Sequence, residues 1–112
     1  MRVYLSGPIT GVKDYEERFA RAEAYYREMR HEVVNPVKVG KQLEGRLGLN
    51  DVTWRQYMEE DIKALVGCDV IALLPGYEES QGATTELMLA EGIGILPTPV
   101  PASLFDGMGG AA

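Results

Sequence analysis

The chain has 112 residues, of which 46% are hydrophobic and 25% are charged, and its formal net charge is −6. This length is sufficient for one domain with a core and too short for two, so we expect a single domain over residues 1–108 and a disordered tail at 109–112. The acidic balance argues against nucleic acid polymers and anionic membranes as main partners, although a few backbone amides can still hold one phosphate.

Several classes of site are disfavoured by what the sequence lacks. The single Cys68 excludes an internal disulfide framework, and the single histidine excludes the usual Cys/His spacing of a metal site. No apolar run approaches the ~18 residues of a membrane helix, and the chain begins with a strand pattern rather than a signal-like region. We therefore expect a cytoplasmic protein without a metal or an organic cofactor.

The first third of the chain alternates between strand and helix patterns. A strand is expected over residues 2–6, followed by a glycine-bounded turn at 7–11. A helix follows over 14–30, and a short strand over 31–35 ends before Pro36. The helix has one apolar face at spacings of four and three, formed by Tyr15, Phe19, Ala22, Tyr26 and Met29.

The rest of the chain continues the alternation after a long connection. Residues 37–52 contain several glycines and are typical of a lid, a ligand-contacting loop or a segment with a short helix. Thr53 and Gln56 have the spacing of a capping box at the start of the next helix. We expect a third strand over 69–74, a helix over 83–92 and a fourth strand over 94–97.

This order of elements indicates an α/β fold. Strands alternating with helices predict a three-layer, doubly wound parallel sheet of four to five strands, flavodoxin- or Rossmann-like, with helices on both faces. Right-handed crossovers bring the loops after the strands together at the carboxyl edge of the sheet. Residues 4–11, the loop after Asn35 and residues 80–86 should therefore converge there.

Residues 80–86 (SQGATTE) are the most informative segment of the chain. They follow an apolar strand and begin a helix, where free backbone N–H groups and the helix dipole favour an anion such as phosphate. Glu86 interrupts the apolar stripe of this helix, and a partly buried carboxylate is costly unless it is paired or used. The alternative is an ordinary N-capping Ser80 with a Glu86 that turns to solvent.

Two further residues are candidates for chemistry. Asp61 shares a helix face with Trp54 and Met58, which is an unusual place for a solvated carboxylate, although a position at the edge of that face explains it equally well. Tyr4 lies inside the first strand, where a core tyrosine with a satisfied hydroxyl is the ordinary explanation. The turn at 7–11 has neither the lysine of a Walker loop nor the glycine spacing of a Rossmann fingerprint.

Taken together, four segments resemble one enzyme family. These are residues 4–11 (YLSGPITG), 59–62 (EEDI), 68–71 (CDVI) and 80–86, which occur in the family's order at compatible separations. The chain resembles the nucleoside 2-deoxyribosyltransferases and the related 2-deoxynucleoside 5-phosphate N-hydrolases, in particular the small branch of this superfamily seen in phages and bacteria.

The resemblance implies roles for particular side chains. At the position of Glu86 the family has the glutamate that attacks the sugar C1′ and forms a glycosyl-enzyme, Tyr4 matches the tyrosine that orients it, and Asp61 matches the aspartate that assists departure of the base. Ser80 matches the monophosphate hydrolases rather than the nucleoside transferases, whereas Thr10 stands where these hydrolases often have arginine. The implied substrate-binding residues are Ser6, Gly7, Ile9, Thr10, Gly11, Ser80, Gln81, Gly82, Trp54 and Ser103, the last of them reaching across a homodimer interface.

The sequence thus predicts a small-molecule enzyme that hydrolyses the base–sugar bond of a (deoxy)nucleoside 5-monophosphate. Two alternatives stay open at this stage: base exchange between nucleosides, and a module that binds or sequesters a nucleotide without turning it over.

Overall fold

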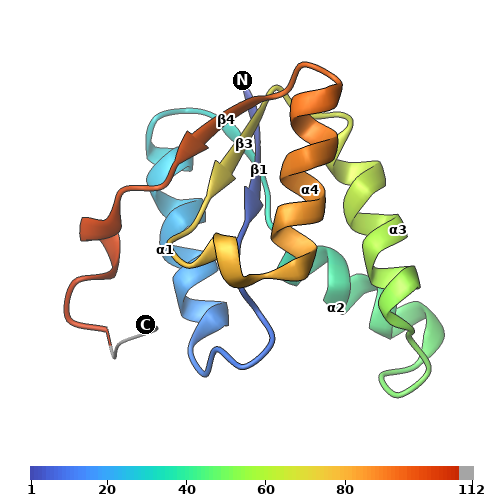
Figure 1. The fold of residues 1–112 in the computed structure, drawn as a ribbon. Coiled ribbons are helices and arrows are strands. Elements are labelled where there is room, and N and C mark those ends of the chain that lie inside the picture. The colour runs from blue at the N-terminus through green and yellow to red at the C-terminus, as the bar shows by residue number, and fades with distance from the viewer. Residues whose placement is uncertain (109–112) are drawn as a thin grey trace.

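The computed structural model describes residues 1–108 and has an α/β fold, as predicted. Four parallel strands form one sheet in the order β2-β1-β3-β4 (Figure 1). The strands are β1 (Arg2–Ser6), β2 (Glu32–Val34), β3 (Val70–Leu73) and β4 (Leu96–Pro99). The helices are α1 (Tyr15–Glu28), α2 (Pro36–Leu47), α3 (Trp54–Leu65) and α4 (Gln81–Gly92), with short 3-10 helices η1 (Tyr77–Glu79) and η2 (Ala102–Phe105).

The alternation of side chains along β1 divides the core into two layers. Val3 and Leu5 are buried on the α1 side, in a cluster that includes Phe19 and Ala22 of that helix. Tyr4 is buried on the opposite side, in a second cluster with Leu65 of α3 and Ala90 of α4. The sheet therefore lies between helices on both faces, which confirms the three-layer prediction.

The strand order creates a crevice at the carboxyl edge of the sheet. From β1 the chain crosses to β2 on one side, whereas β3 continues to β4 on the other. The loops after β1 and β3 therefore leave in opposite directions. The crevice between them is the place where open α/β sheets bind ligands. These loops pack closely, because a Cβ added at Gly7 would lie 2.7 Å from Cβ of Leu74. A larger residue at position 7 would push the two loops apart.

The long connection after β2 is mostly helical, so of the three predicted alternatives the segment that contains a helix is the one found, and this helix spans 12 residues. The side chain of Asn35 accepts a hydrogen bond from the Val37 N–H, and Pro36 occupies the first helical turn. This start is favourable because proline lacks only a donor that would be unpaired there. Gly40 and Gly45 lie inside the 12-residue helix, and their low helix propensity obscured it in the sequence.

The fourth strand is displaced by two residues from its expected position. It pairs with β3 over Leu96–Pro99 rather than over 94–97. The N–H groups of Leu96 and Val100 donate to the carbonyls of Asp69 and Leu73. Because direction alternates along a strand, Pro97 and Pro99 face away from β3, so their missing N–H groups do not interrupt the pairing.

Both predicted helix caps are confirmed, but some apolar faces were assigned wrongly. Thr53 and Gln56 form the capping box of α3, and Ser80 caps α4 through the Ala83 N–H. Met29, predicted on the apolar face of the first helix, is exposed beyond the end of α1, and Trp54 is 57% exposed at the start of α3. The spacing of apolar residues along a helix does not show where the neighbouring element that packs against it ends.

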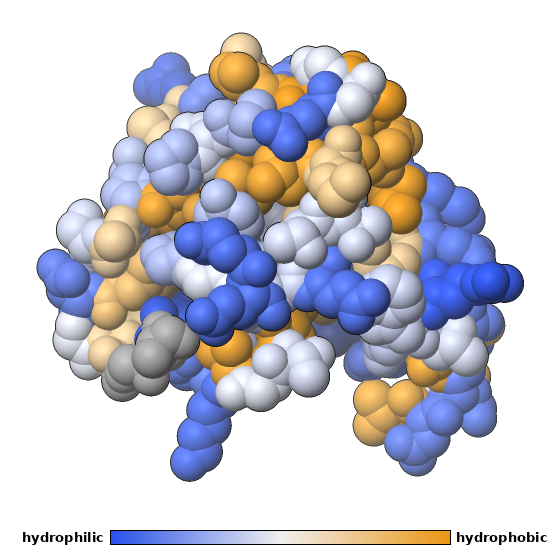
Figure 2. All heavy atoms as spheres, viewed as in Figure 1, coloured by the Kyte–Doolittle hydropathy of each residue, from blue (hydrophilic) through white to orange (hydrophobic). Residues whose placement is uncertain are grey.

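Figure 2 shows apolar atoms on the surface over α4 and β4, where Met88, Ile93 and Leu96 are exposed. Within residues 1–108, no helix has the length and apolar character needed to cross a bilayer. The tail predicted at residues 109–112 lies outside the described residues.

Candidate active site

A cleft of about 430 Å³ opens at the carboxyl edge of the sheet. Five parts of the chain form its walls: the loop after β1, the first residue of α1, the first turns of α2, the side of α3 and the start of α4. The three segments expected to converge there therefore do so. The lining residues are Gly7, Ile9, Thr10, Tyr15, Pro36, Val37, Gly40, Lys41, Glu44, Trp54, Tyr57, Met58, Asp61, Ser80, Gly82, Ala83 and Glu86.

Two hydroxyl groups of β1 bind the carboxyl group of Glu86 from the buried side, away from the cleft. Tyr4 donates a hydrogen bond of 2.6 Å to Oε2, and Ser6 donates one of 2.7 Å to Oε1. Residues two apart on a strand point to the same face, which is why both hydroxyls meet α4. Glu86 is only 5% exposed but lines the cleft. Its position excludes the alternative in which it turns to solvent.

The surroundings of Glu86 and Tyr4 determine which group carries the proton. Burial raises the pKa of Glu86, and the hydrogen bonds from Tyr4 and Ser6 offset part of that rise. Burial and the negative charges of Glu86 and Asp61 raise the pKa of Tyr4 well above its ordinary value. The Tyr4 hydroxyl therefore remains a donor, and it favours the ionised form of Glu86.

Asp61 is the second acid of the cleft, and it lies on the inner side of α3. Burial, together with the charges of Glu86 and Glu60, raises the pKa of Asp61 to about 7. A carboxyl group with this pKa holds a proton at neutral pH for much of the time and can give it to a leaving group. Two acids with different surroundings can divide the roles of acid and nucleophile.

The start of α4 offers unpaired backbone donors beside these acids. The Ser80 hydroxyl accepts from the Ala83 N–H, and the Ser80 carbonyl accepts from the Thr84 N–H. The N–H groups of Gln81 and Gly82 have no acceptor among the described residues. A helix start with free amides stabilises a bound anion through both hydrogen bonding and the helix dipole.

The outer wall of the cleft contains residues that sequence reasoning did not identify as site residues. Tyr57 of α3 donates a hydrogen bond of 2.6 Å to Oε2 of Glu44 on α2. Lys41 also lines the cleft, and its ammonium group lies 3.0 Å from Oε2 of Glu16. Asn35-Pro36 is a sequence pattern typical of a helix start and could have identified Lys41 and Glu44. In a helix that begins there, both residues lie on the same face as Val37.

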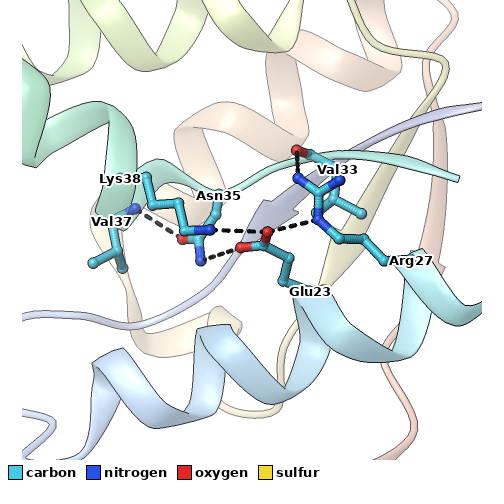
Figure 3. Close-up of polar contacts among 6 residues, drawn as sticks. All are labelled: Glu23, Arg27, Val33, Asn35, Val37 and Lys38. Atoms are coloured by element: carbon cyan, nitrogen blue, oxygen red, sulfur yellow. Dashed lines mark hydrogen bonds and ion pairs between the residues drawn. The ribbon is translucent and has the colours of Figure 1, made fainter.

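A polar network around the buried carboxylate of Glu23 links α2 to α1 (Figure 3). Glu23 of α1 accepts hydrogen bonds from Arg27 (2.7 Å), Asn35 (3.1 Å) and Lys38 (3.0 Å). Asn35 is also the cap of α2, so this carboxylate holds the residue with which that helix begins. The network lies outside the cleft but determines where one of its walls stands.

The predicted site residues fall into three groups. Eight line the cleft: Gly7, Ile9, Thr10, Trp54, Asp61, Ser80, Gly82 and Glu86. Tyr4 and Ser6 are fully buried and contact Glu86 rather than the cleft. Gly11, Gln81 and Ser103 do not line the cleft, and Ser103 is exposed on η2, which packs against α1.

Comparison with protein families gives one match. A family model described as a domain of unknown function, DUF4406, matches residues 1–97. The chain belongs to the DUF4406 family. The matched region contains every residue that lines the cleft, together with Tyr4 and Ser6, so the site lies wholly within the DUF4406 domain. Neither the curated proteins nor the solved structures gave a match.

Proposed function

We propose that this DUF4406 protein hydrolyses the base–sugar bond of a (deoxy)nucleoside 5-monophosphate. One observation carries the proposal: the Glu86 carboxyl group faces a cleft while the hydroxyls of Tyr4 and Ser6 hold both of its oxygens. A carboxylate fixed in this way has its attacking lone pairs directed before substrate arrives. The second acid, Asp61, has a pKa of about 7 and lines the same cleft.

The reaction has two balanced steps. In the first, a Glu86 oxygen bonds to the sugar C1′ as the C1′–N bond breaks, and the bond's electron pair goes to the base with a proton from Asp61. In the second, water attacks C1′, its proton passes to the Asp61 carboxylate, and the Glu86–sugar bond breaks. The products are the free base and the sugar phosphate, and both acids return to their starting states.

The start of α4 supports the choice of a monophosphate. The free N–H group of Gly82, which lines the cleft, lies one turn before Glu86 along the helix, so an anion there is near the nucleophile. A third carboxylate at position 80 would repel phosphate, whereas Ser80 does not. The resemblance of residues 80–86 to the monophosphate hydrolases points in the same direction.

The decisive experiment is a panel of nucleoside and deoxynucleoside monophosphates, assayed by chromatography for released base. We expect release from at least one nucleotide and a loss of roughly a thousandfold or more in Glu86→Gln, with nucleotide binding retained. A second free base added to the assay distinguishes hydrolysis from exchange, because only exchange forms a hybrid nucleotide. Tight binding with no base released from any nucleotide by the wild type would contradict the proposal and favour a sequestering module.

A further inference from the structure

The cleft has one wall that the proposed chemistry does not use. If Glu86 meets the sugar and the start of α4 meets the phosphate, the base must lie along the remaining wall, between α2 and α3. That wall presents Glu44, Trp54 and Tyr57. The following inference rests on the proposed function for this orientation of the ligand.

Two aromatic side chains of this wall suit a flat ring. Trp54 is 57% exposed although it lines the cleft, which is a high exposure for the largest apolar side chain. The Tyr57 ring packs against α2, where a Cβ added at Gly40 would lie 3.5 Å from Cε1 of Tyr57. Exposed and fixed aromatic rings bind nucleobases by stacking.

Glu44 offers one unpaired acceptor at the same wall. Its Oε2 accepts the hydrogen bond from Tyr57, whereas Oε1 accepts none from the described residues. The hydrogen bond to Glu44 raises the pKa of Tyr57, so this hydroxyl stays a donor and fixes the carboxylate. Lys41 is the nearby cation of this wall, and its ammonium group is paired with Glu16. The acceptor of Glu44 is therefore left for a ligand.

We propose that Glu44 selects the base: its free Oε1 accepts an N–H from an exocyclic amino group on the base edge remote from the sugar. A carbonyl at the same ring position would place one acceptor against another, and the carboxylate would repel it. The substrate class is thus a nucleoside monophosphate with an amino-bearing base, as opposed to its oxo counterpart. A site built to pair a hydrogen-bonding group discriminates strongly against analogues that lack it.

The test measures equilibrium binding in the Glu86→Gln variant of the full chain, so that turnover does not interfere. Calorimetry compares adenosine with inosine monophosphate, and cytidine with uridine monophosphate, in both ribo and deoxy forms. Each pair differs by amino against oxo at one ring carbon, and the adjacent ring nitrogen is an acceptor in the amino member and an N–H donor in the oxo member. We expect the amino member of at least one pair to bind about tenfold or more tightly, a difference of about 1.4 kcal/mol.

Matched substitutions identify the residue responsible. When Glu44→Gln is added to the Glu86→Gln variant, the dissociation constants of the amino and oxo nucleotides should come within about twofold of each other. The reason is that an amide offers both a donor and an acceptor. Glu59→Gln is the matched control, since it makes the same change from carboxylate to amide at an exposed residue of α3 that does not line the cleft, and it should keep the preference. Glu44→Asp serves as a second variant if Glu44→Gln unfolds, and should keep the sign of the preference with a smaller ratio.

Failure of this inference is distinguishable from failure of the proposed function. Equal affinities within both pairs, an oxo preference, a preference that survives Glu44→Gln, or no binding of any nucleotide would each overturn the role of Glu44. Release of base by the wild type decides the proposed function separately. Amino and oxo nucleotides cleaved alike would leave the glycosidase standing without base selection by Glu44.

Discussion

The hydroxyl of Tyr4 donates a hydrogen bond of 2.6 Å to Oε2 of Glu86, across 82 positions of the chain. The bond joins the first strand of the sheet to the helix that follows the third strand. It forms inside the core, where Tyr4 is fully buried, yet the carboxyl group it holds lines a cleft. In the proposed reaction Tyr4 is therefore a positioning residue, and the group that would touch substrate is Glu86.

Tyr4→Phe should change the pH dependence of the proposed reaction as well as its rate. The hydrogen bond from Tyr4 lowers the pKa of Glu86, so its loss should raise the pKa that governs the acid limb of kcat. We expect kcat to fall by roughly 10- to 100-fold, measured as base release against pH. Tyr26→Phe is the control, because Tyr26 is a buried tyrosine on the α1 side of the sheet. A lower rate with an unmoved acid limb would assign Tyr4 a packing role only.

Asp61→Asn should abolish proton donation to the departing base while leaving the nucleophile in place. With ordinary nucleotides we expect a loss of about 10²- to 10⁴-fold and disappearance of the alkaline limb near pH 7. A purine nucleotide methylated at N7 carries a positive charge and departs without a proton, so its first turnover, measured as a burst of released base, should be nearly unchanged. Later turnovers should still slow, because Asp61 also takes the proton of water in the second step. Glu59→Gln, an exposed neighbour on α3, is the control. Equal losses in the first turnover of both substrates would show that Asp61 is not the acid.

Glu23→Gln should destabilise the fold in a pH-dependent manner. Burial opposes the ionisation of Glu23, but hydrogen bonds from Arg27, Asn35 and Lys38 outweigh it and lower the pKa. A lowered folded-state pKa contributes stability above the unfolded-state value near 4.5, and this stability is lost as the pH falls through the folded-state value. We expect a loss of about 1–3 kcal/mol at pH 7.

Urea unfolding of wild type and variant between pH 7 and pH 3 measures this difference. The free-energy gap should shrink as the pH falls below about 4.5. Glu17→Gln is a matched control on the same helix, because Glu17 makes an exposed pair with Arg21 that should contribute less than about 1 kcal/mol. A gap that is constant across the whole pH range would mean that ionisation of Glu23 does not stabilise α2.

The outward edge of β4 should resist pairing with another strand. Pro97 and Pro99 face away from β3, so the edge presents no N–H donor at those positions. Pro97→Val with Pro99→Val restores both donors and should increase self-association, measured by light scattering over a range of protein concentrations. Thr98→Val is the control, because its N–H faces β3. Identical scattering by the double variant and the control would show that the prolines do not protect this edge.

Much of the fold follows from local patterns in the sequence. The strand–helix alternation, the capping box at Thr53 and the cap at Ser80 depend on neighbouring residues, so they were predicted correctly. The full length of α2 and the register of β4 were not, because glycines and prolines lower local propensity without forbidding the element. Asn35 supplies the cap of α2, and the alternation of N–H directions in β4 tolerates its prolines.

The sequence by itself determined the order of the elements, the helix start at residues 80–86 and the choice of Glu86, Asp61 and Tyr4 as candidates. Periodicity and capping depend on contacts a few residues apart, and these are visible in one dimension. Only the tertiary structure decided that Ser6 supports Glu86 from behind, that Trp54 is exposed at a cleft, and that Glu44 pairs with Tyr57. Burial and hydrogen-bond partners depend on which distant segments the sheet brings together, and spacing along the chain does not encode that directly.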